Sequence, residues 1–483
     1  MGPVQNWCGI WSGFVSVLHS GSFTHGNFRK VFYLFPDILL QESVLLNGLK
    51  RTLGVWQAAA VSIGAIIGAG IFVLIGVASG FAGPAVILSF ILAGLASFFT
   101  ALSAAELSSF ITESGGSYIY THHAFGRFWG FLVGWMQSAD YMIGASAVSI
   151  GFAGYFLYFF NIPQNIAVLI LIACALPLVL GLINLRGMRE AAGTNSILVL
   201  LKIIALILFV TVGGLYVYTH GPGGNYTPFF PNGISGMLNG AAVIFFAFVG
   251  FNTVTVIAEE VKDPERNVPR ALLLALAICA ILYISVSVVA IGLINWSQLA
   301  VSSAPLESAL AVATGNLFIL KYVSIAALFA TASVVITSIF GGSRQIYAMA
   351  RQRVLPAALA RVSENGVPVV SVILVSLVVS AVVLLAGGDL TTLAQVFNFG
   401  TLMTFFFINL SLVKLRWDQP GAHRGFAVPF YPLTPLLGII SCSLLLAYLS
   451  RYAMLFGAIW IAIGVFIFEL GMKRHAGVAE EKQ

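Results

Sequence analysis

Charged residues are scarce in this sequence: Asp, Glu, Lys and Arg together make up 8% of its 483 residues. An ordinary soluble domain carries about a quarter. Hydrophobic residues account for 59%, and the mean hydropathy is +0.99. A soluble enzyme needs a polar surface, and a nucleic-acid-binding protein needs a basic face. The composition therefore excludes both classes, and we expect a protein embedded in the lipid bilayer with no nucleic-acid partner.

Cysteine and histidine are also too few, and too scattered, to build a metal centre. The four cysteines are Cys8, Cys174, Cys279 and Cys442; they form no C-x-x-C spacing, and three of them lie inside apolar runs. None of the seven histidines falls in the middle of an apolar run. This pattern argues against a disulfide framework and a zinc site. We expect no metal and no cofactor.

The basic residues are concentrated in a few of the gaps between apolar runs. Almost all of the 23 Lys and Arg residues lie in such gaps, and the net charge is +6. Basic gaps at Arg186–Arg189, Lys262–Arg270, Arg351–Arg361 and Lys414–Arg424 alternate with gaps that contain almost no Lys or Arg. Positive residues remain on the cytoplasmic side of a membrane. We therefore expect these gaps and both termini to be cytoplasmic, in a multi-pass protein of the plasma membrane.

Long apolar runs fill most of the chain from Trp56 onward, and a membrane-spanning helix needs about 20 apolar residues. About twelve runs qualify, centred near Gly68, Phe98, Ala145, Ile172, Leu206, Phe248, Ile281, Ser333, Leu377, Met403, Ser441 and Ile461. The sequence therefore predicts an all-α polytopic membrane protein with about twelve transmembrane helices. Residues 1–50 contain no run of this length and are predicted to form a cytoplasmic tail.

Two of the predicted spans are interrupted at about the same depth. The first reads GAIIGAGIF from Gly64 to Phe72, and the sixth reads FAFVGFNT from Phe246 to Thr253. The sixth span comes five spans after the first. Because five is an odd number, the two segments enter the membrane from opposite sides, which is typical of inverted repeats. The predicted organisation is a first repeat at 51–219 with helices 1–5, a second at 220–416 with helices 6–10, helices 11 and 12 at 417–472, and a cytoplasmic tail at 473–483.

A helix that unwinds inside the bilayer exposes backbone groups that need a partner. At Gly68–Gly70, the half-helix beginning near Ile71 offers N–H groups and a positive dipole end, which suit a carboxylate. The half-helices ending near Ile66 and Phe246 offer carbonyls, which suit an ammonium group. Together they match an amino acid zwitterion. The alternative is that glycines let helices pack closely, and we prefer that explanation for Gly76 and Gly80.

Three motifs carry a resemblance to a known family: GAIIGAGIF, the GGSY of 115–118, and FFAFVGFNTVTVIAEEVKDPERNVPRA of 245–271. Together they resemble the amino acid-polyamine-organocation (APC) superfamily, most closely its cationic amino acid transporter branch and the proton-coupled prokaryotic relatives of that branch. The resemblance extends from Lys50 to about Lys473. It implies a leucine-transporter-like fold, with two inverted five-helix repeats plus two further helices, and a permease that works by alternating access.

The resemblance also implies a substrate site. In that family, amides matching Ala69, Gly70 and Ile71 hold the substrate carboxylate, and carbonyls matching Ile66, Phe246 and Val249 hold the ammonium. The ring of Phe246 resembles a gate over the substrate. The complete set of predicted substrate-binding residues is Ile66, Gly68, Ala69, Gly70, Ile71, Phe246, Val249, Gly250, Asn252 and Asp140.

One departure from the family pattern bears on the substrate. Cationic transporters of this family commonly carry an acid in a G-F-D motif of the sixth span, whereas this chain has Asn252 after Phe251. A carboxamide cannot neutralise a basic side chain. We therefore expect neutral amino acids such as alanine. Cationic substrates stay open because Asp140 could supply the missing charge.

Lys202 is the main ionisable candidate within a span, where a charge costs about 2.5–3.5 kcal/mol or more. It lies about eight residues past the inner edge of the fifth span, or roughly 12 Å at 1.5 Å per residue. Proton-coupled relatives carry a lysine here. The expected partners are the backbone near Gly64 and a hydroxyl of the eighth span, with Ser333 a better match than Thr337. This arrangement predicts proton coupling; the alternative is a lysine that snorkels to the headgroups.

Two acids complete the candidates. Asp140 lies about thirteen residues from Arg127, near the bilayer midplane, and is predicted to line the substrate pocket or transfer protons, the alternative being a structural hydrogen bond. Glu106, about four residues from the inner end of the second span, matches an A-E-L motif of the family. It is either a gating or a structural residue.

The sequence thus predicts a secondary active transporter that carries amino acids together with protons. Within the same class, the alternative is a sodium-independent exchanger or uniporter; a nutrient sensor would bind without turnover. A membrane-embedded enzyme would need a cluster of catalytic groups, and Lys202 with Ser333 is the only candidate pair, so we expect no enzyme. A channel would need a selectivity filter or charged ring, and neither pattern is present. The oligomeric state stays open.

Overall fold

The computed structural model describes residues 51, 53–113, 115–185, 191–351, 355–363 and 367–480. The predicted cytoplasmic tail at 1–50 lies outside the described residues, as do 481–483. The fold described below is that of the helical unit beginning at Leu53.

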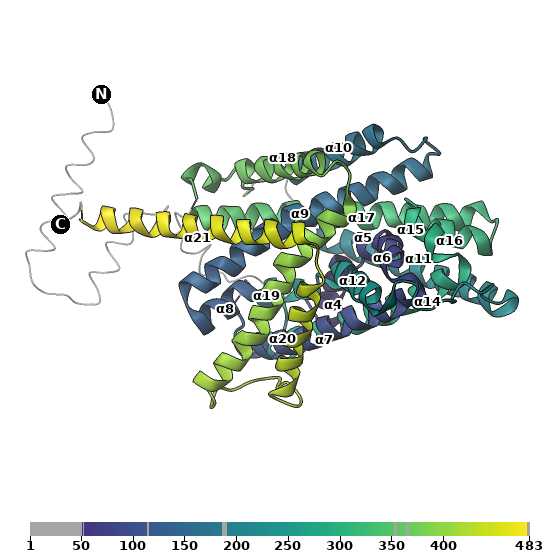
Figure 1. Ribbon diagram of the computed structural model, residues 1–483. Helices are drawn as coiled ribbons and strands as arrows, with labels where there is room; N and C mark the ends of the chain where they lie inside the picture. Colours follow the sequence, from purple (N-terminus) through teal and green to yellow (C-terminus); the bar gives the residue numbers. More distant parts are fainter. Residues whose placement is uncertain are drawn as a thin grey trace, which may run out of the picture. The chain divides into compact units, whose positions relative to one another are not determined.

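The described chain consists of α-helices and short 3₁₀ turns (Figure 1). The helices are α4 (Val55–Ile66), α5 (Ala69–Phe72), α6 (Leu74–Ala82), α7 (Val86–Phe110), α8 (Ser117–Phe125), α9 (Arg127–Phe159), α10 (Ile166–Leu185), α11 (Ala191–His220), α12 (Gly233–Ile244), α13 (Thr253–Val256), α14 (Pro264–Leu293), α15 (Trp296–Val301), α16 (Pro305–Ala313), α17 (Leu317–Arg351), α18 (Val369–Leu385), α19 (Leu390–Asp418), α20 (Leu433–Ala447) and α21 (Arg451–Glu480). The only extended pairing among the described residues is an isolated bridge between Leu53 and Val261. The predicted all-α class is confirmed.

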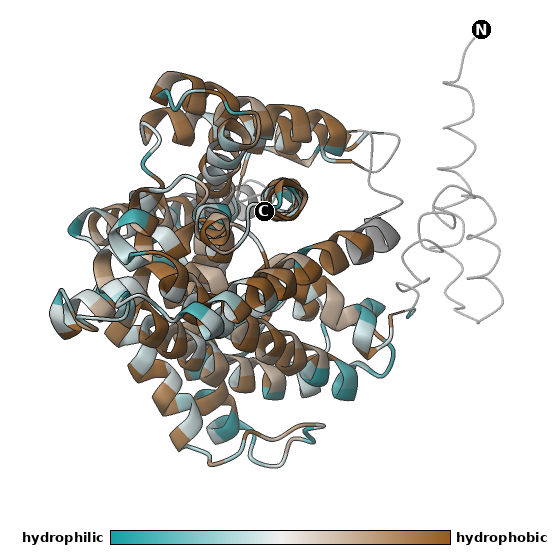
Figure 2. Ribbon diagram, turned by 90° about the vertical axis from the view of Figure 1, so that its right-hand side faces the viewer, coloured by the Kyte–Doolittle hydropathy of each residue, from teal (hydrophilic) through white to brown (hydrophobic). Residues whose placement is uncertain are grey.

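Nine segments of the described chain are long and apolar enough to cross a membrane, and α4, α18 and α20 are shorter apolar helices. The helices in Figure 2 are largely brown, and α10 is apolar along nearly its whole length. A helix with no polar face must contact lipid or protein on all sides. The chain is therefore a polytopic membrane protein, while the twelve-helix inverted-repeat topology stays a prediction.

The core contains two sets of closely packed helices. In one, α14 packs along α7 and α4; in the other, α9 packs along α17 and α19. Buried glycine, alanine and serine dominate the facing sides of α7 and α9, and such small residues let membrane helices approach closely. At the far end of the chain, α21 continues to Glu480, so residues 473–480, predicted as a tail, are helical.

Both predicted helix interruptions are present. The first separates α4 from α5: Ile67 is extended, and Gly68 precedes the first residue of α5, Ala69. This half-helix therefore begins two residues before the predicted Ile71. The second follows α12, which tightens into a 3₁₀ turn, η2 (Phe245–Phe248), before the chain unwinds at 249–252 and restarts as α13.

The two interruptions cross with their backbones in contact, and two glycines permit this crossing. A Cβ atom on Gly70 would lie 2.3 Å from the Cα of Ala247, and one on Gly250 would lie 2.8 Å from the carbonyl carbon of Ala65. Gly250 also has a φ of +119°, which side chains rarely adopt. Gly70 therefore has a packing role in addition to its predicted role in binding.

The predicted packing role of Gly76 and Gly80 is confirmed by their contacts with the loop that contains α15. A Cβ atom on Gly76 would lie 2.7 Å from the carbonyl oxygen of Leu299, and one on Gly80 would lie 3.2 Å from the Cβ of Ala300. This loop therefore covers α6, the helix that follows the first interruption.

Replacing Gly70 with Ala should destabilise the close crossing of the two interruptions. The added methyl group would meet backbone, which cannot rotate away, and overpacking of this kind costs about 1–3 kcal/mol. We expect the melting temperature of the purified protein to fall by several degrees. Gly214→Ala is the matched control, because its nearest contact would be an ordinary 3.6 Å from Val289. Equal melting temperatures for the two variants would contradict the crossing.

Candidate substrate and proton site

The first interruption presents a row of backbone donors. Ala69, Gly70 and Ile71 begin α5, so their N–H groups have no acceptor in a preceding turn of that helix. All three residues are buried. The positive end of the α5 dipole lies at these N–H groups, because the dipole arises from the same aligned peptide units. This end of α5 is chemically suited to a carboxylate.

Two of the carbonyls predicted to hold an ammonium group already accept one hydrogen bond each. The Ile66 carbonyl accepts a 2.9 Å hydrogen bond from the hydroxyl of Tyr283, a buried residue of α14. The Phe246 carbonyl accepts a 3.3 Å bond from the N–H of Val249. Because a carbonyl oxygen has two lone pairs, each can accept one further hydrogen bond. The two interruptions thus place donors and acceptors within one buried region.

The side chain of Phe246 connects this region to the second set of helices. Its ring centroid lies 4.4 Å from that of Phe397 on α19, and Phe397 in turn lies against Gly144 of α9. The residue is 9% exposed. An aromatic ring at this boundary can separate the buried region between the interruptions from one side of the protein. The gating role of Phe246 stays a prediction.

Asn252 lies at the second interruption, where it precedes α13. Its carbonyl accepts a 2.7 Å hydrogen bond from the hydroxyl of Thr255, and the residue is half-buried. Its side chain is uncharged. The position that carries an acid in cationic transporters therefore provides no countercharge here.

Lys202 of α11 is fully buried and makes three hydrogen bonds. Its ammonium donates to the carbonyl of Gly64 at 3.0 Å, to the carbonyl of Ile67 at 2.9 Å and to the hydroxyl of Ser333 at 2.8 Å. An ammonium group has three donors, and all three are used. The snorkelling alternative is wrong, because this ammonium ends inside the bundle.

The geometry ties Lys202 to the first interruption. Gly64 and Ile67 lie at the end of α4, where helix carbonyls lose their partners. Thr337, the second hydroxyl considered from the sequence, instead donates to the Ser333 carbonyl. Lys202 therefore joins three helices, α4, α11 and α17, at a single point.

Asp140 is connected to a different part of the bundle. It accepts a 3.1 Å hydrogen bond from the hydroxyl of Thr401, and Gly400 leaves room for its carboxylate. A small cavity around it is lined by α9, α19 and α21, including Trp460. The structure thus joins Asp140 to α19 and α21 rather than to either interruption, which favours the structural alternative.

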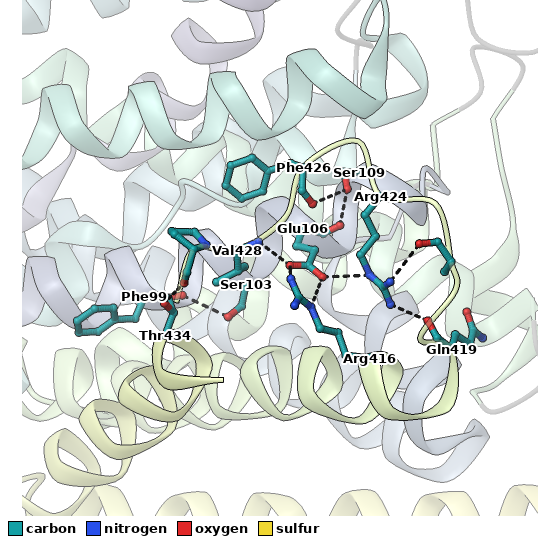
Figure 3. A network of polar contacts seen from close by, with 12 residues as sticks. Phe99, Ser103, Glu106, Ser109, Arg416, Gln419, Arg424, Phe426, Val428 and Thr434 are labelled. Carbon is teal, nitrogen blue, oxygen red and sulfur yellow. Dashed lines mark hydrogen bonds and ion pairs between the residues drawn. The ribbon is translucent and has the colours of Figure 1, made fainter. Parts of the chain in front are cut away.

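Glu106 lies at the end of α7 with its carboxylate fully buried between two arginines (Figure 3). Arg416 donates two hydrogen bonds, of 2.7 and 2.5 Å, and Arg424 forms an ion pair at 3.0 Å. The N–H of Val428 donates a further bond at 2.7 Å. A buried carboxylate is tolerated when it is paired in this way. These contacts fasten α7 to α19 and to the loop that follows α19, and they favour the structural alternative for Glu106.

Comparison with known proteins assigns the family. A sequence profile of amino acid permeases matches residues 53–469, almost the whole described chain. The chain belongs to the amino acid permease family. The resemblance to the APC superfamily drawn from the sequence motifs is thereby confirmed, and the permease is a multi-pass membrane protein of a transporter family.

The permease is similar to transporters with different named substrates. It is 33% identical over 455 residues to the branched-chain amino acid permease BcaP of Bacillus subtilis (strain 168), covering 89% of this chain and 95% of that protein. It is 36% identical over 447 residues to the methylthioribose transporter of the same organism, covering 89% and 95%. It is 32% identical over 389 residues to the vacuolar cationic amino acid transporter 4 of Arabidopsis thaliana, covering 77% and 64%.

A further acid, Glu307, was not predicted from the sequence. It lies in α16, outside the spans, and is only 3% exposed, with no described hydrogen-bond partner for its Oε2 atom. Burial raises its pKa to about 7, and the opposing charge of Lys321 on α17 lowers that pKa in part. The sequence signal for it is a lone acid in the apolar stretch PLESALAV of 305–312.

Docking of α16 should depend on pH through Glu307. Because its pKa is raised on burial, the docked state is favoured by a bound proton, and this advantage is lost as the pH rises through about 7. Hydrogen exchange of residues 302–313, corrected for intrinsic rates, should therefore increase from about pH 6 to about pH 8. Glu307→Gln should remove this increase, whereas the exposed-site control Glu469→Gln should retain it. An increase that persists in Glu307→Gln would show that another group titrates.

Proposed function

We propose that this permease is a secondary active transporter that moves neutral amino acids across the membrane together with protons. The observation that carries the proposal is the set of three hydrogen bonds from Lys202 to Gly64, Ile67 and Ser333. Through them, one titratable group holds the end of α4 beside the backbone donors of α5. Proton binding and substrate binding therefore share one structural element.

The substrate would bind between the two interruptions. The α5 amides would hold its carboxylate, and the carbonyls of Ile66, Phe246 and Val249 would hold its ammonium group. Backbone groups need no particular substrate side chain, so the zwitterion itself is recognised. The ring of Phe246 would close over the bound molecule. The proposed binding residues are Ile66, Gly68, Ala69, Gly70, Ile71, Phe246, Val249, Gly250 and Asn252.

Neutral side chains fit this site better than basic ones. A buried basic group needs a countercharge, whereas Asn252 is uncharged and Asp140 is engaged with Thr401. The named substrates of the similar proteins cover branched-chain amino acids, cationic amino acids and methylthioribose. The last lacks the zwitterion for which the donors and acceptors of the interruptions are suited.

Proton coupling would act through the position of α4. A protonated Lys202 can donate to all three acceptors, whereas a neutral amine has only two N–H donors. Loss of the proton therefore leaves one acceptor unsatisfied in an apolar interior, which favours a different arrangement of α4 and α17. In the proposed topology, repeats at 51–219 and 220–416 would move against each other. Helices at 417–472 would flank them, with both termini cytoplasmic in the plasma membrane.

Uptake into proteoliposomes tests the function and the coupling together. With labelled leucine or alanine, we expect accumulation driven by an inward proton gradient, without sodium and without internal amino acid. Labelled lysine and methylthioribose should accumulate far less. Uptake that requires preloaded amino acid would favour the exchanger instead, and selective accumulation of methylthioribose would refute the assignment of an amino acid substrate.

Lys202→Ala should abolish proton-driven accumulation, because the proton-binding group is gone. Ser333→Ala removes one acceptor and keeps the lysine, so it should weaken the coupling. Lys414→Ala is the matched control; that lysine pairs with Asp418 at the end of α19, away from α4. Melting temperatures establish folding of each variant. An unchanged pH dependence in folded Lys202→Ala would refute the assigned role.

A further inference from the structure

A basic cavity lies at the end of the bundle where α14 begins, away from the two interruptions. Its volume is 190 Å³, and its walls are Arg266, Pro269, Arg270 and Leu273 of α14 together with Gly425 and Phe426 of the α19–α20 loop. The four α14 residues are spaced at i, i+3, i+4 and i+7, so they share one face of the helix. The cavity is smaller than the roughly 300–1,000 Å³ of pockets for drug-sized ligands. It is suited to a single small group.

The charge in this cavity is uncompensated by the described side chains. Arg266 and Arg270 are one turn apart on the same face, and like charges at this spacing repel each other. Both lie in the first two turns of α14, where the helix dipole is also positive. Neither arginine forms an ion pair with a described acidic residue, although Glu265 is next to Arg266 in the chain. An anion between the two guanidinium groups would relieve this repulsion.

The opposite wall of the cavity is held in place by Glu106. The Glu106 carboxylate pairs with Arg424 and accepts from the N–H of Val428, on either side of Gly425 and Phe426 (Figure 3). The hydroxyl of Ser109 donates to the Phe426 carbonyl at 3.3 Å. The loop is therefore fastened to α7 while its other side faces the arginines.

The close approach of the loop to α14 also requires a glycine. A Cβ atom on Gly425 would lie 2.9 Å from the carbonyl oxygen of Glu265. The loop and the first turn of α14 are thus in direct contact at this edge of the cavity.

The position of the cavity relative to the bilayer points to a lipid. α14 has 30 residues, or about 45 Å at 1.5 Å per residue, which exceeds a hydrocarbon layer of about 30 Å. All charged residues of α14 lie in its first two turns, so we infer that these turns form the end that extends into the headgroup layer, with Leu273 next to the apolar part of the helix. Leu273, Pro269 and Phe426 give the cavity apolar walls. A soluble anion would leave these walls in water, whereas a phospholipid would cover them.

We propose that this cavity binds the phosphate group of an anionic glycerophospholipid. Arg266 and Arg270 would donate to the phosphate oxygens, because guanidinium groups match phosphate geometry. The start of an acyl chain would run along Leu273. The bound lipid would join α14 to the α19–α20 loop from outside the bundle. This assignment is independent of the proposed substrate and of proton coupling.

Native mass spectrometry of the full-length protein with added phosphatidylglycerol or phosphatidylcholine tests the assignment. We expect wild-type protein to prefer phosphatidylglycerol. Arg266→Gln/Arg270→Gln should weaken phosphatidylglycerol binding about 25-fold, since each surface charge contributes roughly fivefold. The single variants should lie between. Arg361→Gln/Arg451→Gln removes two exposed arginines elsewhere and should bind as wild type.

Three results would overturn the assignment. Equal binding of the two lipids would show that charge is not recognised. Wild-type affinity in Arg266→Gln/Arg270→Gln would show that these arginines are not the site. Displacement of phosphatidylglycerol by millimolar inorganic phosphate would identify a site for a soluble anion. Because both arginines are exposed and lack described partners, the double variant should keep the melting temperature of the wild type in neutral detergent. If the double variant melts at a lower temperature than the wild type, phosphatidylglycerol binding is compared between the wild type and the single variants instead.

Discussion

The fold depends on how backbone groups are satisfied where α4 stops inside an apolar bundle. Carbonyls at the end of a helix need donors, and no water is available in the hydrocarbon layer. The Lys202 ammonium supplies two of these donors and the Tyr283 hydroxyl supplies another, to Ile66. A buried charge is itself costly and is tolerated because all three of its own donors are used. The interruption and the buried lysine therefore explain each other.

The same constraint explains why the two interruptions touch. Each unwound segment has a glycine without a side chain at the contact and exposes polar backbone groups. Contact between the two segments therefore keeps the polar backbone of both away from lipid. Gly70 against Ala247 and Gly250 against Ala65 allow this contact. Phe246 then lies at the boundary with α19, next to Phe397. The residues proposed for substrate recognition, for proton binding and for the aromatic gate all lie at or next to this one crossing, and this is why we propose a single transport cycle for them.

Local features of the chain were predicted well. Among the distant pairings, the contacts of Lys202 with Gly64 and Ser333 were expected through the family resemblance and are present, whereas others were not predicted. The glycine-rich motif is a continuous run of residues, and the depth of Lys202 follows from counting residues along one span. The interruption and a buried lysine could therefore be expected from the sequence. The new half-helix begins at Ala69, two residues earlier than expected, which the run of glycines and alanines alone does not specify. The pairing of Glu106 with Arg416 joins residues far apart in the chain, and the burial of Glu307 depends on how a loop folds back. Such contacts follow from packing, which periodicity does not encode.

The central claim is that bare backbone at the crossing grips an amino acid zwitterion. An experimental structure with bound leucine tests it most directly. The account predicts substrate density with its carboxylate on the N–H groups of Ala69–Ile71 and its ammonium on the carbonyls of Ile66 and Phe246. Density elsewhere, for example against Asp140 between α9 and α19, would contradict it.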